Sequence, residues 1–326
     1  MKERVSAYTE GVISESRERR KKKNHFMASF EWKKTWPLHL LVLPVVIFAI
    51  IFNYLPMFGN IMAFQDYKPW EGFFGSQWVG FSHFEALFKF DDSVQVIWNT
   101  FIISVLKIVF GLIVPIIMAL LLNEIRKMSI KRGIQTMVYL PHFLSWVILG
   151  GILIDILSIN GGIVNRLLES GFGIEPIFFL GNGDWFRTVL VTSDIWKEFG
   201  FSMIVYLASI SGVNPDLYEA AEMDGANRFK QTWHVTLPAM LPIIIVISTL
   251  QLGNILNAGF DQVFNLYNPL VYDKGDVIDT YVYRMGLESG NFSFATAVGL
   301  FKSLISFVLI VVAYRLAYKL ANYRIF

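Results

Sequence analysis

Long apolar runs separated by short polar segments dominate the sequence. A helix crosses a bilayer with roughly 20 apolar residues at a rise of ~1.5 Å each, and six runs reach that length. The predicted spans are residues 37–56, 96–122, 135–157, 188–212, 238–258 and 293–315. The pattern predicts an all-α polytopic membrane protein with about six transmembrane helices, in which a basic segment, residues 1–36, precedes a transmembrane domain, residues 37–326.

Composition supports a membrane protein and excludes thiol chemistry. Hydrophobic residues make up 54% of the chain, and its mean hydropathy is +0.49. Soluble domains carry more charge on their surfaces. Cysteine is absent, which excludes disulfides, thiolate metal sites and cysteine nucleophiles.

Basic residues are distributed unevenly between the loops, and this predicts the orientation of the chain. If the N-terminus is cytoplasmic, segments on the cytoplasmic side hold 19 of the 28 lysines and arginines, whereas the outside loops hold six. The positive-inside rule then places both termini and the loop 213–237 in the cytoplasm. The basic run at residues 17–23 precedes a full-length span, so we interpret it as part of a retained signal-anchor that contacts membrane lipid rather than nucleic acid.

The loop 213–237 carries the signals of a short helix. Asn214 is a suitable N-cap, and Pro215 suits the first helical position. Ala220 and Ala221 keep the helix narrow, and Gly225 is a typical helix-ending residue. We therefore expect a short cytoplasmic helix that a partner protein can approach closely.

Sequence signatures of catalysis are missing from the chain. There is no Gly-x-x-x-x-Gly-Lys-Ser/Thr motif for phosphates and no Gly-x-Ser-x-Gly turn. The five histidines are scattered without metal-binding spacing. We expect no catalytic residue, no metal site and no cofactor in this chain.

Polar residues inside the predicted spans are candidates for a transport path, because they are costly in lipid. Gln251, Asn254 and Asn257 have a spacing that predicts one face of the fifth helix. Their neutral amides could hold sugar hydroxyls, although hydrogen bonding between helices explains them equally well.

Charged and aromatic residues in the spans add further candidates. Asp194 could pair with Lys197 one turn further along the fourth span. Trp146 and Trp196 could stack on pyranose rings, but intramembrane aromatic residues more often pack or face lipid. Both interpretations, sugar stacking and packing, stay open for these two tryptophans.

The loop 213–237 also resembles a known sequence motif. Glu219-Ala220-Ala221, Asp224-Gly225 and Leu237-Pro238 occur in the order found in the EAA loop of permease subunits of ATP-binding-cassette (ABC) importers. Residues 139–143, 196–213 and 291–303 are similar to sugar-importing members, especially those that serve oligosaccharides or polysaccharide fragments through lipoprotein binding proteins.

This resemblance implies the fold and partners of a type I importer in a bacterial cytoplasmic membrane. The chain would form half of a sugar path, together with a second permease subunit, two ATPase subunits and an extracellular solute-binding lipoprotein. ATP and Mg²⁺ would bind to the ATPases, so the chain itself would not be an enzyme. The ATPase contact would consist of Glu219, Ala220, Ala221, Asp224 and Gly225.

Two alternatives stay open on the sequence alone. The chain could be an ABC permease for a non-sugar solute such as a peptide, or a membrane anchor or signalling subunit through which nothing passes. A secondary transporter fits less well, because such proteins often show paired inverted halves and this chain has a single EAA-like loop.

Overall fold

The computed structural model describes the backbone of residues 32–321 and the side chains of residues 35–315. The chain divides into two compact units, Met1–Gly59 and Asn60–Phe326. Most of the predicted basic segment, including residues 17–23, lies outside the described residues.

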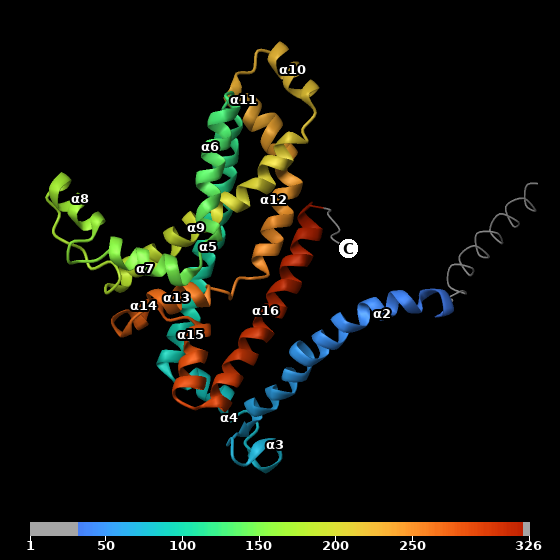
Figure 1. Cartoon of the computed structure of the whole chain (residues 1–326), viewed down its shortest axis with the longest axis vertical. Helices are drawn as coiled ribbons and strands as arrows, with labels where there is room; N and C mark the ends of the chain where they lie inside the picture. Colours follow the sequence, from blue (N-terminus) through green and yellow to red (C-terminus); the bar gives the residue numbers. More distant parts are fainter. Residues whose placement is uncertain (1–31, 322–326) are drawn as a thin grey trace, which may run out of the picture. The chain divides into compact units, whose positions relative to one another are not determined.

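The first predicted span is confirmed as an apolar helix that is longer than predicted. Helix α2, Trp32–Ala49, continues through a π-helical turn, Ile50–Tyr54, into a 3₁₀ segment, Leu55–Phe64 (Figure 1). The stretch Thr35–Phe64 is long and apolar enough to cross a membrane.

Helices form nearly all of the second unit. The elements are β1 (Gln65–Asp66), α3 (Gly72–Gly75), β2 (Gln77–Trp78), α4 (Ser82–Lys89), α5 (Asp91–Asn123), α6 (Met128–Tyr139), η3 (Leu140–Phe143), α7 (Trp146–Ile156), α8 (Ile163–Phe172), α9 (Gly183–Ser211), α10 (Pro215–Met223), α11 (Arg228–Gln231), η4 (Thr232–Thr236), α12 (Leu237–Leu252), α13 (Phe260–Leu266), η5 (Pro269–Val271), α14 (Tyr272–Gly275), α15 (Ile278–Tyr283), η6 (Arg284–Glu288) and α16 (Phe292–Ala321). The two short strands pair antiparallel, with Gln65 opposite Trp78.

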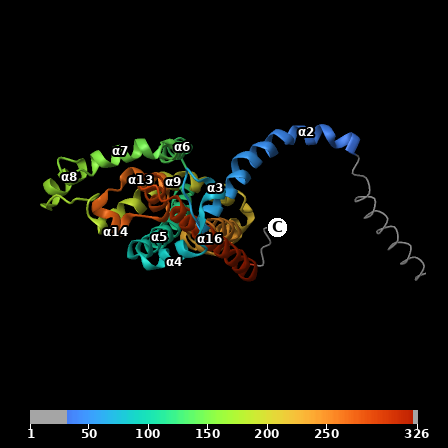
Figure 2. The same ribbon diagram turned by 90° about the horizontal axis from the view of Figure 1, so that it is seen from below.

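The long helices α5, α9, α12 and α16 form the body of this unit, and α7, α8 and α14 lie to one side of it (Figure 1). Helices α10 and α11 lie at one end, beside the end of α5 and the start of α6, whereas α4 and α15 lie at the opposite end (Figure 1). A second view shows α5, α9 and α16 grouped together (Figure 2). The loop 213–237 and the basic turn after α5 therefore share one end, as the charge pattern predicts.

The helices differ from the six predicted spans in how continuous their apolar stretches are. Among the described residues, four helices are long and apolar enough to cross a membrane: Thr35–Phe64, Asp91–Asn123, Arg228–Leu252 and Phe292–Arg315. Residues 128–156 make a fifth only if a helix pair bent by 104° counts as one span. The break interrupts the predicted third span at residues 144–145, where the backbone is extended and Ser145 caps a new helix by accepting a bond from Ile148 N (3.4 Å).

The predicted fourth span exists as helix α9 but is not uniformly apolar. It has 29 residues, which at ~1.5 Å per residue is enough to cross a bilayer. Asp194, Lys197 and Glu198 lie in its middle. These charges require polar or charged partners from other segments of the protein.

Three apolar clusters hold the second unit together. One joins α5, α9 and α12 around Met203, Tyr206 and Met240. A second joins α5, α9 and α13 around Phe186, and the third joins α4, α5, α15 and α16 around Phe294. Helix α5 contributes to all three clusters and α9 to two of them, so these two helices are central to the packing.

Helix α9 approaches α6 closely at Gly200. A Cβ atom at this position would lie 2.0 Å from the carbonyl oxygen of Val138. No side chain fits there without a backbone shift, so glycine is what allows α9 to lie against the end of α6.

The predicted outer loop 259–292 is folded against α5. Asn99 Nδ2 donates to the carbonyl oxygens of Asp273 (3.1 Å) and Asp276 (3.2 Å). Arg284 Nη2 pairs with Asp276 Oδ2 at 2.5 Å. Burial raises the pKa of Asp276, against the opposing effects of Thr280 and Arg284. The segment is therefore an ordered part of the fold.

Candidate coupling helix and translocation cavity

The predicted helix of the loop 213–237 is confirmed as α10. Asn214 Oδ1 accepts a hydrogen bond from Asp216 N (3.1 Å), and Pro215 occupies the first turn. This side-chain bond satisfies one of the free N–H groups at the helix start. The local sequence therefore determines where the helix begins.

Gly225 ends helix α10, as predicted. Its φ is +75°, a left-handed conformation that suits glycine. Ala226 N donates to Ala221 O (2.9 Å) and Gly225 N donates to Glu222 O (3.0 Å), the two bonds of a Schellman motif. The turn sends the chain back toward α11 and α12.

The predicted ATPase contact residues lie on the accessible surface of this helix and turn. Glu219, Ala220, Asp224 and Gly225 are exposed, and Ala221 is half-buried. Two large apolar neighbours, Met223 and Phe229, were not predicted as part of this surface, and they are 89% and 75% exposed. Their position within a charged loop was the available signal, since large exposed apolar side chains mark interaction surfaces.

Replacing Gly225 with valine is expected to abolish transport while leaving membrane insertion intact. No heavy atom lies within 4 Å of a Cβ built at Gly225, so the cost comes from the left-handed backbone, about 1–2 kcal/mol for an ordinary residue. The distorted turn would displace α10 from the contact that the sequence predicts with an ATPase. Uptake in cells, with the amount of chain in the membrane measured in parallel, tests this.

Gly225→Asn is the matched control, because asparagine tolerates the left-handed region better than valine does. We expect it to keep most of the uptake. Equal uptake by the valine variant and the unmodified chain would contradict a role for this turn in coupling.

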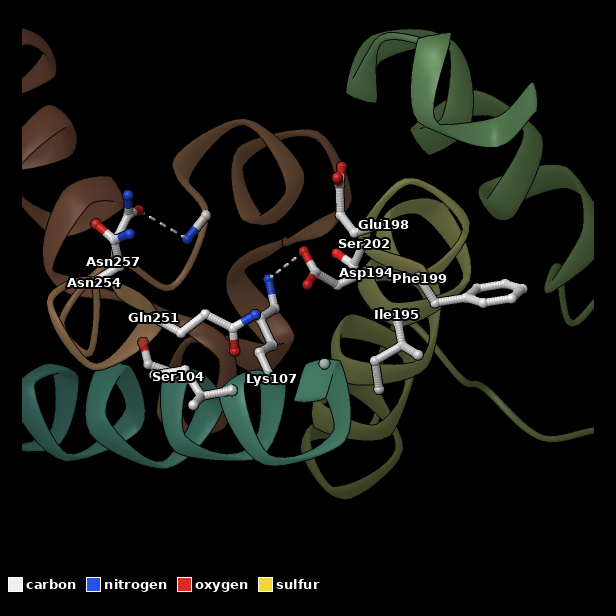
Figure 3. A pocket seen from close by; sticks show the side chains of 13 residues that line it. Ser104, Lys107, Asp194, Ile195, Glu198, Phe199, Ser202, Gln251, Asn254 and Asn257 are labelled. Atoms are coloured by element: carbon white, nitrogen blue, oxygen red, sulfur yellow. Dashed lines mark hydrogen bonds and ion pairs between the residues drawn. The ribbon is translucent and has the colours of Figure 1, made fainter. Parts of the chain in front are cut away.

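A cavity of about 540 Å³ lies between α5, α9 and a third segment, which is made of the last turn of α12 and the turns that follow it. Ser104 and Lys107 line it from α5, Asp194, Glu198 and Ser202 from α9, and Gln251, Asn254 and Asn257 from the third segment (Figure 3). Its volume is within the usual range for small-molecule sites, about 300–1,000 Å³.

Lys107 binds all three walls of the cavity together. It is 8% exposed, and its ammonium pairs with Asp194 Oδ1 at 3.1 Å (Figure 3). It also donates to Ala258 O (2.7 Å) and to Gln262 Oε1. The prediction that Asp194 pairs with Lys197 is therefore wrong, because Asp194 pairs with a residue on α5 instead of one on its own helix.

Glu198 belongs to a second group of polar contacts, which joins α9 to the bend between α6 and α7. Its Oε1 lies 3.1 Å from Lys197 Nζ, and its Oε2 lies 2.8 Å from His142 Nδ1. Lys197 Nζ also donates to His142 O (2.7 Å). The imidazole of His142 stacks on Phe201 with 4.3 Å between ring centroids. The bent helix pair is thus fixed to α9 beside the cavity.

The structure brings the predicted amides to the cavity but not along a helix face. Helix α12 ends at Leu252, and Asn254 and Asn257 lie in the turns that follow. Gly253 N bonds to Thr249 O (3.3 Å), and Asn257 N bonds to Asn254 O (2.7 Å). The prediction was wrong about the helix because it extended the apolar pattern past Gly253.

The two predicted tryptophans do not line this cavity. Trp146 lies over Lys197, with 5.8 Å between Nζ and the ring centroid. Trp196 lines a separate, mainly apolar pocket of about 330 Å³ with Trp185 and Phe179. Thr192 Oγ1 and Ser193 Oγ at that pocket bond to carbonyl groups of their own helix (2.7 and 2.6 Å).

The sequence analysis missed Ser104, Ser202 and Gln262 at the site. The signal that could have found them was indirect: Lys107 in an apolar helix needs acceptors nearby. Serine and glutamine are common polar residues in membrane helices, and nothing in their spacing marked these three positions.

Comparison with known proteins identifies the family. The family described as "Binding-protein-dependent transport system inner membrane component" matches residues 111–322. The chain belongs to this family. It is therefore a multi-pass membrane permease of a transport system, and α10 and the cavity walls from α9 and α12 lie within the family region.

Relatives with high identity include two proteins of Bacillus subtilis (strain 168). The permease is 44% identical over 289 residues to the polygalacturonan/rhamnogalacturonan transport system permease protein YteP, which covers 89% of this chain and 90% of YteP. It is 45% identical over 282 residues to protein LplB, covering 86% and 88% of the two chains.

A solved structure shares the fold of the permease. A chain of a bacterial ABC transporter involved in the import of the acidic polysaccharide alginate is 40% identical, with a TM-score of 0.82 over 89% of this chain and 98% of that chain. The same transporter type has been solved in complex with an alginate pentasaccharide-bound periplasmic protein, with 39% identity and a TM-score of 0.82. The predicted type I ABC importer permease fold is confirmed.

Proposed function

We propose that the permease moves an oligosaccharide or polysaccharide fragment inward through the cavity between α5, α9 and residues 251–259. The observation that supports this most directly is the polar lining of the cavity of about 540 Å³ between these segments. Relatives named for polygalacturonan/rhamnogalacturonan, galactooligosaccharide and arabinooligosaccharide transport support the substrate class.

Helix α10 is the proposed contact with an ATPase subunit. Ala220 and Ala221 allow close approach, Glu219 and Asp224 offer carboxylates, and Gly225 sets the turn. ATP and Mg²⁺ would bind to the ATPase pair and not to this chain. A second permease subunit would complete the path, and an extracellular solute-binding lipoprotein would deliver the substrate.

The connection from α10 to the cavity is short. Helix α9 ends at Ser211 and α10 begins at Pro215, so movement of α10 acts directly on the helix that carries Asp194 and Glu198. On the other side, Tyr218 and Thr236 hydroxyls are 3.0 Å apart and link α10 to the start of α12. ATPase closure would thus reach two walls of the cavity.

The proposed location is the bacterial cytoplasmic membrane with α10 and both termini in the cytoplasm. The uneven distribution of lysine and arginine supports this orientation. The arrangement of α10 and the turn after α5 at a common end of the helices agrees with it (Figure 1).

Copurification of the tagged chain in mild detergent, with mass spectrometry of the associated proteins, tests this proposal. We expect a second permease and a P-loop ATPase in the sample, and no ATP hydrolysis by the chain after the ATPase is removed. A sample from cells with the untagged chain is the control. Recovery of the chain alone, folded and monodisperse, would contradict the importer assignment.

A further inference from the structure

The charged groups of the cavity are paired with one another. Lys107 directs its ammonium to Asp194 Oδ1, to Ala258 O and to Gln262 Oε1. An ammonium has three donors, so these three acceptors use them all. Lys107 therefore has no free hydrogen to offer to a transported molecule.

Glu198 is likewise occupied. Both oxygens of its carboxylate have partners, Lys197 at 3.1 Å and His142 at 2.8 Å. Asp194 uses one oxygen for Lys107 and is one-quarter exposed. Among the described residues that line the cavity, there is thus one cation, already paired, and there are two carboxylates.

Two polar atoms at the cavity are not paired. Ser104 Oγ and Gln251 Oε1 are buried and have no hydrogen-bond partner among the described residues. Ser104 is only 1% exposed, and both residues line the cavity (Figure 3). Buried polar atoms are normally satisfied, so these two atoms point to a ligand with hydroxyl groups.

We propose that this cavity binds an uncharged, hydroxylated unit of the transported saccharide, with Gln251 Oε1 and Ser104 Oγ as contacts, and disfavours a sugar carboxylate. This inference rests on the proposed function. A hydroxyl can donate to Gln251 Oε1 and bond with Ser104 Oγ, whereas a carboxylate would face Asp194 and Glu198 without a free cation. An acidic saccharide would have to place its charges elsewhere in the path.

Uptake by the reconstituted complete importer tests the inference with two substitutions at one position. The probes are a set of neutral galactooligosaccharides and a set of oligogalacturonates. Gln251→Leu removes the acceptor and is expected to lower uptake on the order of tenfold, the value of about one hydrogen bond. Gln251→Glu keeps an acceptor, and its charged oxygen bonds hydroxyls strongly, so it should retain far more uptake than Gln251→Leu.

A site for a sugar carboxylate predicts the reverse order, because a glutamate would repel the substrate. Uptake by Gln251→Glu that is equal to or lower than that of Gln251→Leu would overturn the inference. The amount of each variant recovered with its partner subunits corrects for folding. If the unmodified importer takes up no saccharide of either set, the proposed function itself fails, and this outcome is seen before any variant is compared.

Ser104→Ala provides an independent measurement with a matched control. We expect it to lower uptake severalfold, because it removes the second contact. Ser248→Ala is the control: Ser248 Oγ donates to Ile244 O (2.7 Å) within α12 and does not line the cavity. Uptake that is equal in these two serine variants would remove Ser104 from the site.

Discussion

Replacing Gly200 with alanine is expected to separate helices α9 and α6 and to destabilise the chain. The new Cβ would lie 2.0 Å from Val138 O and 2.6 Å from Val138 C. Both are backbone atoms, so no side-chain rotation relieves the clash. Overpacking of this kind costs about 1–3 kcal/mol, and more when the backbone must move. Thermal unfolding of the purified chain in detergent would measure the loss, and uptake should fall with it.

Gly299→Ala in α16 is the matched control. No heavy atom lies within 4 Å of its built Cβ, and alanine is favoured over glycine in a helix by about 0.8–1.0 kcal/mol. We expect this variant to be at least as stable as the unmodified chain. Equal melting temperatures for the Gly200 and Gly299 variants would contradict the close approach of α9 to α6.

Replacing Asp194 with leucine is the second change with a large expected effect. It leaves the ammonium of Lys107, which is 8% exposed, without its counter-ion. Breaking a buried ion pair from one side costs about 3–5 kcal/mol, because an uncompensated charge remains. We expect a marked fall in the melting temperature and in the amount of folded chain in the membrane.

A substitution of Lys107 and a double substitution separate the effect of ion pairing on stability from the effect of side-chain packing. Lys107→Met should cost less, because Asp194 is 25% exposed and can be hydrated in the cavity. The double variant Lys107→Met with Asp194→Leu should recover much of the stability, since no charge is left unpaired. A double variant no more stable than Asp194→Leu would show that the pair is not the source of the loss.

Glu85→Gln is a control for charge removal at the surface. Its partner Lys89 is 3.5 Å away, and both side chains are largely exposed. Exposed pairs contribute about 0–1 kcal/mol, so the melting temperature should hardly change. A loss as large as that of Asp194→Leu would mean that the assay does not distinguish buried from exposed pairs.

Local signals in the sequence predicted α10 correctly because capping is a short-range effect. Asn214, Pro215 and Gly225 act within one or two turns of their own positions. The spans confirmed as apolar helices were equally accessible, because their signal is a continuous apolar run. The break at residues 144–145 was missed because both residues lie inside such a run.

The sequence by itself determined the class of protein, the apolar helices and the form of helix α10. Each of these depends on residues close together in the chain. Only the tertiary structure decided that Lys107 pairs with Asp194, that Glu198 meets His142, and that Ser104 and Gln251 share a cavity. Those pairings join residues that are 56 to 147 positions apart, and their choice depends on how α5, α9 and the end of α12 pack, which no local spacing encodes.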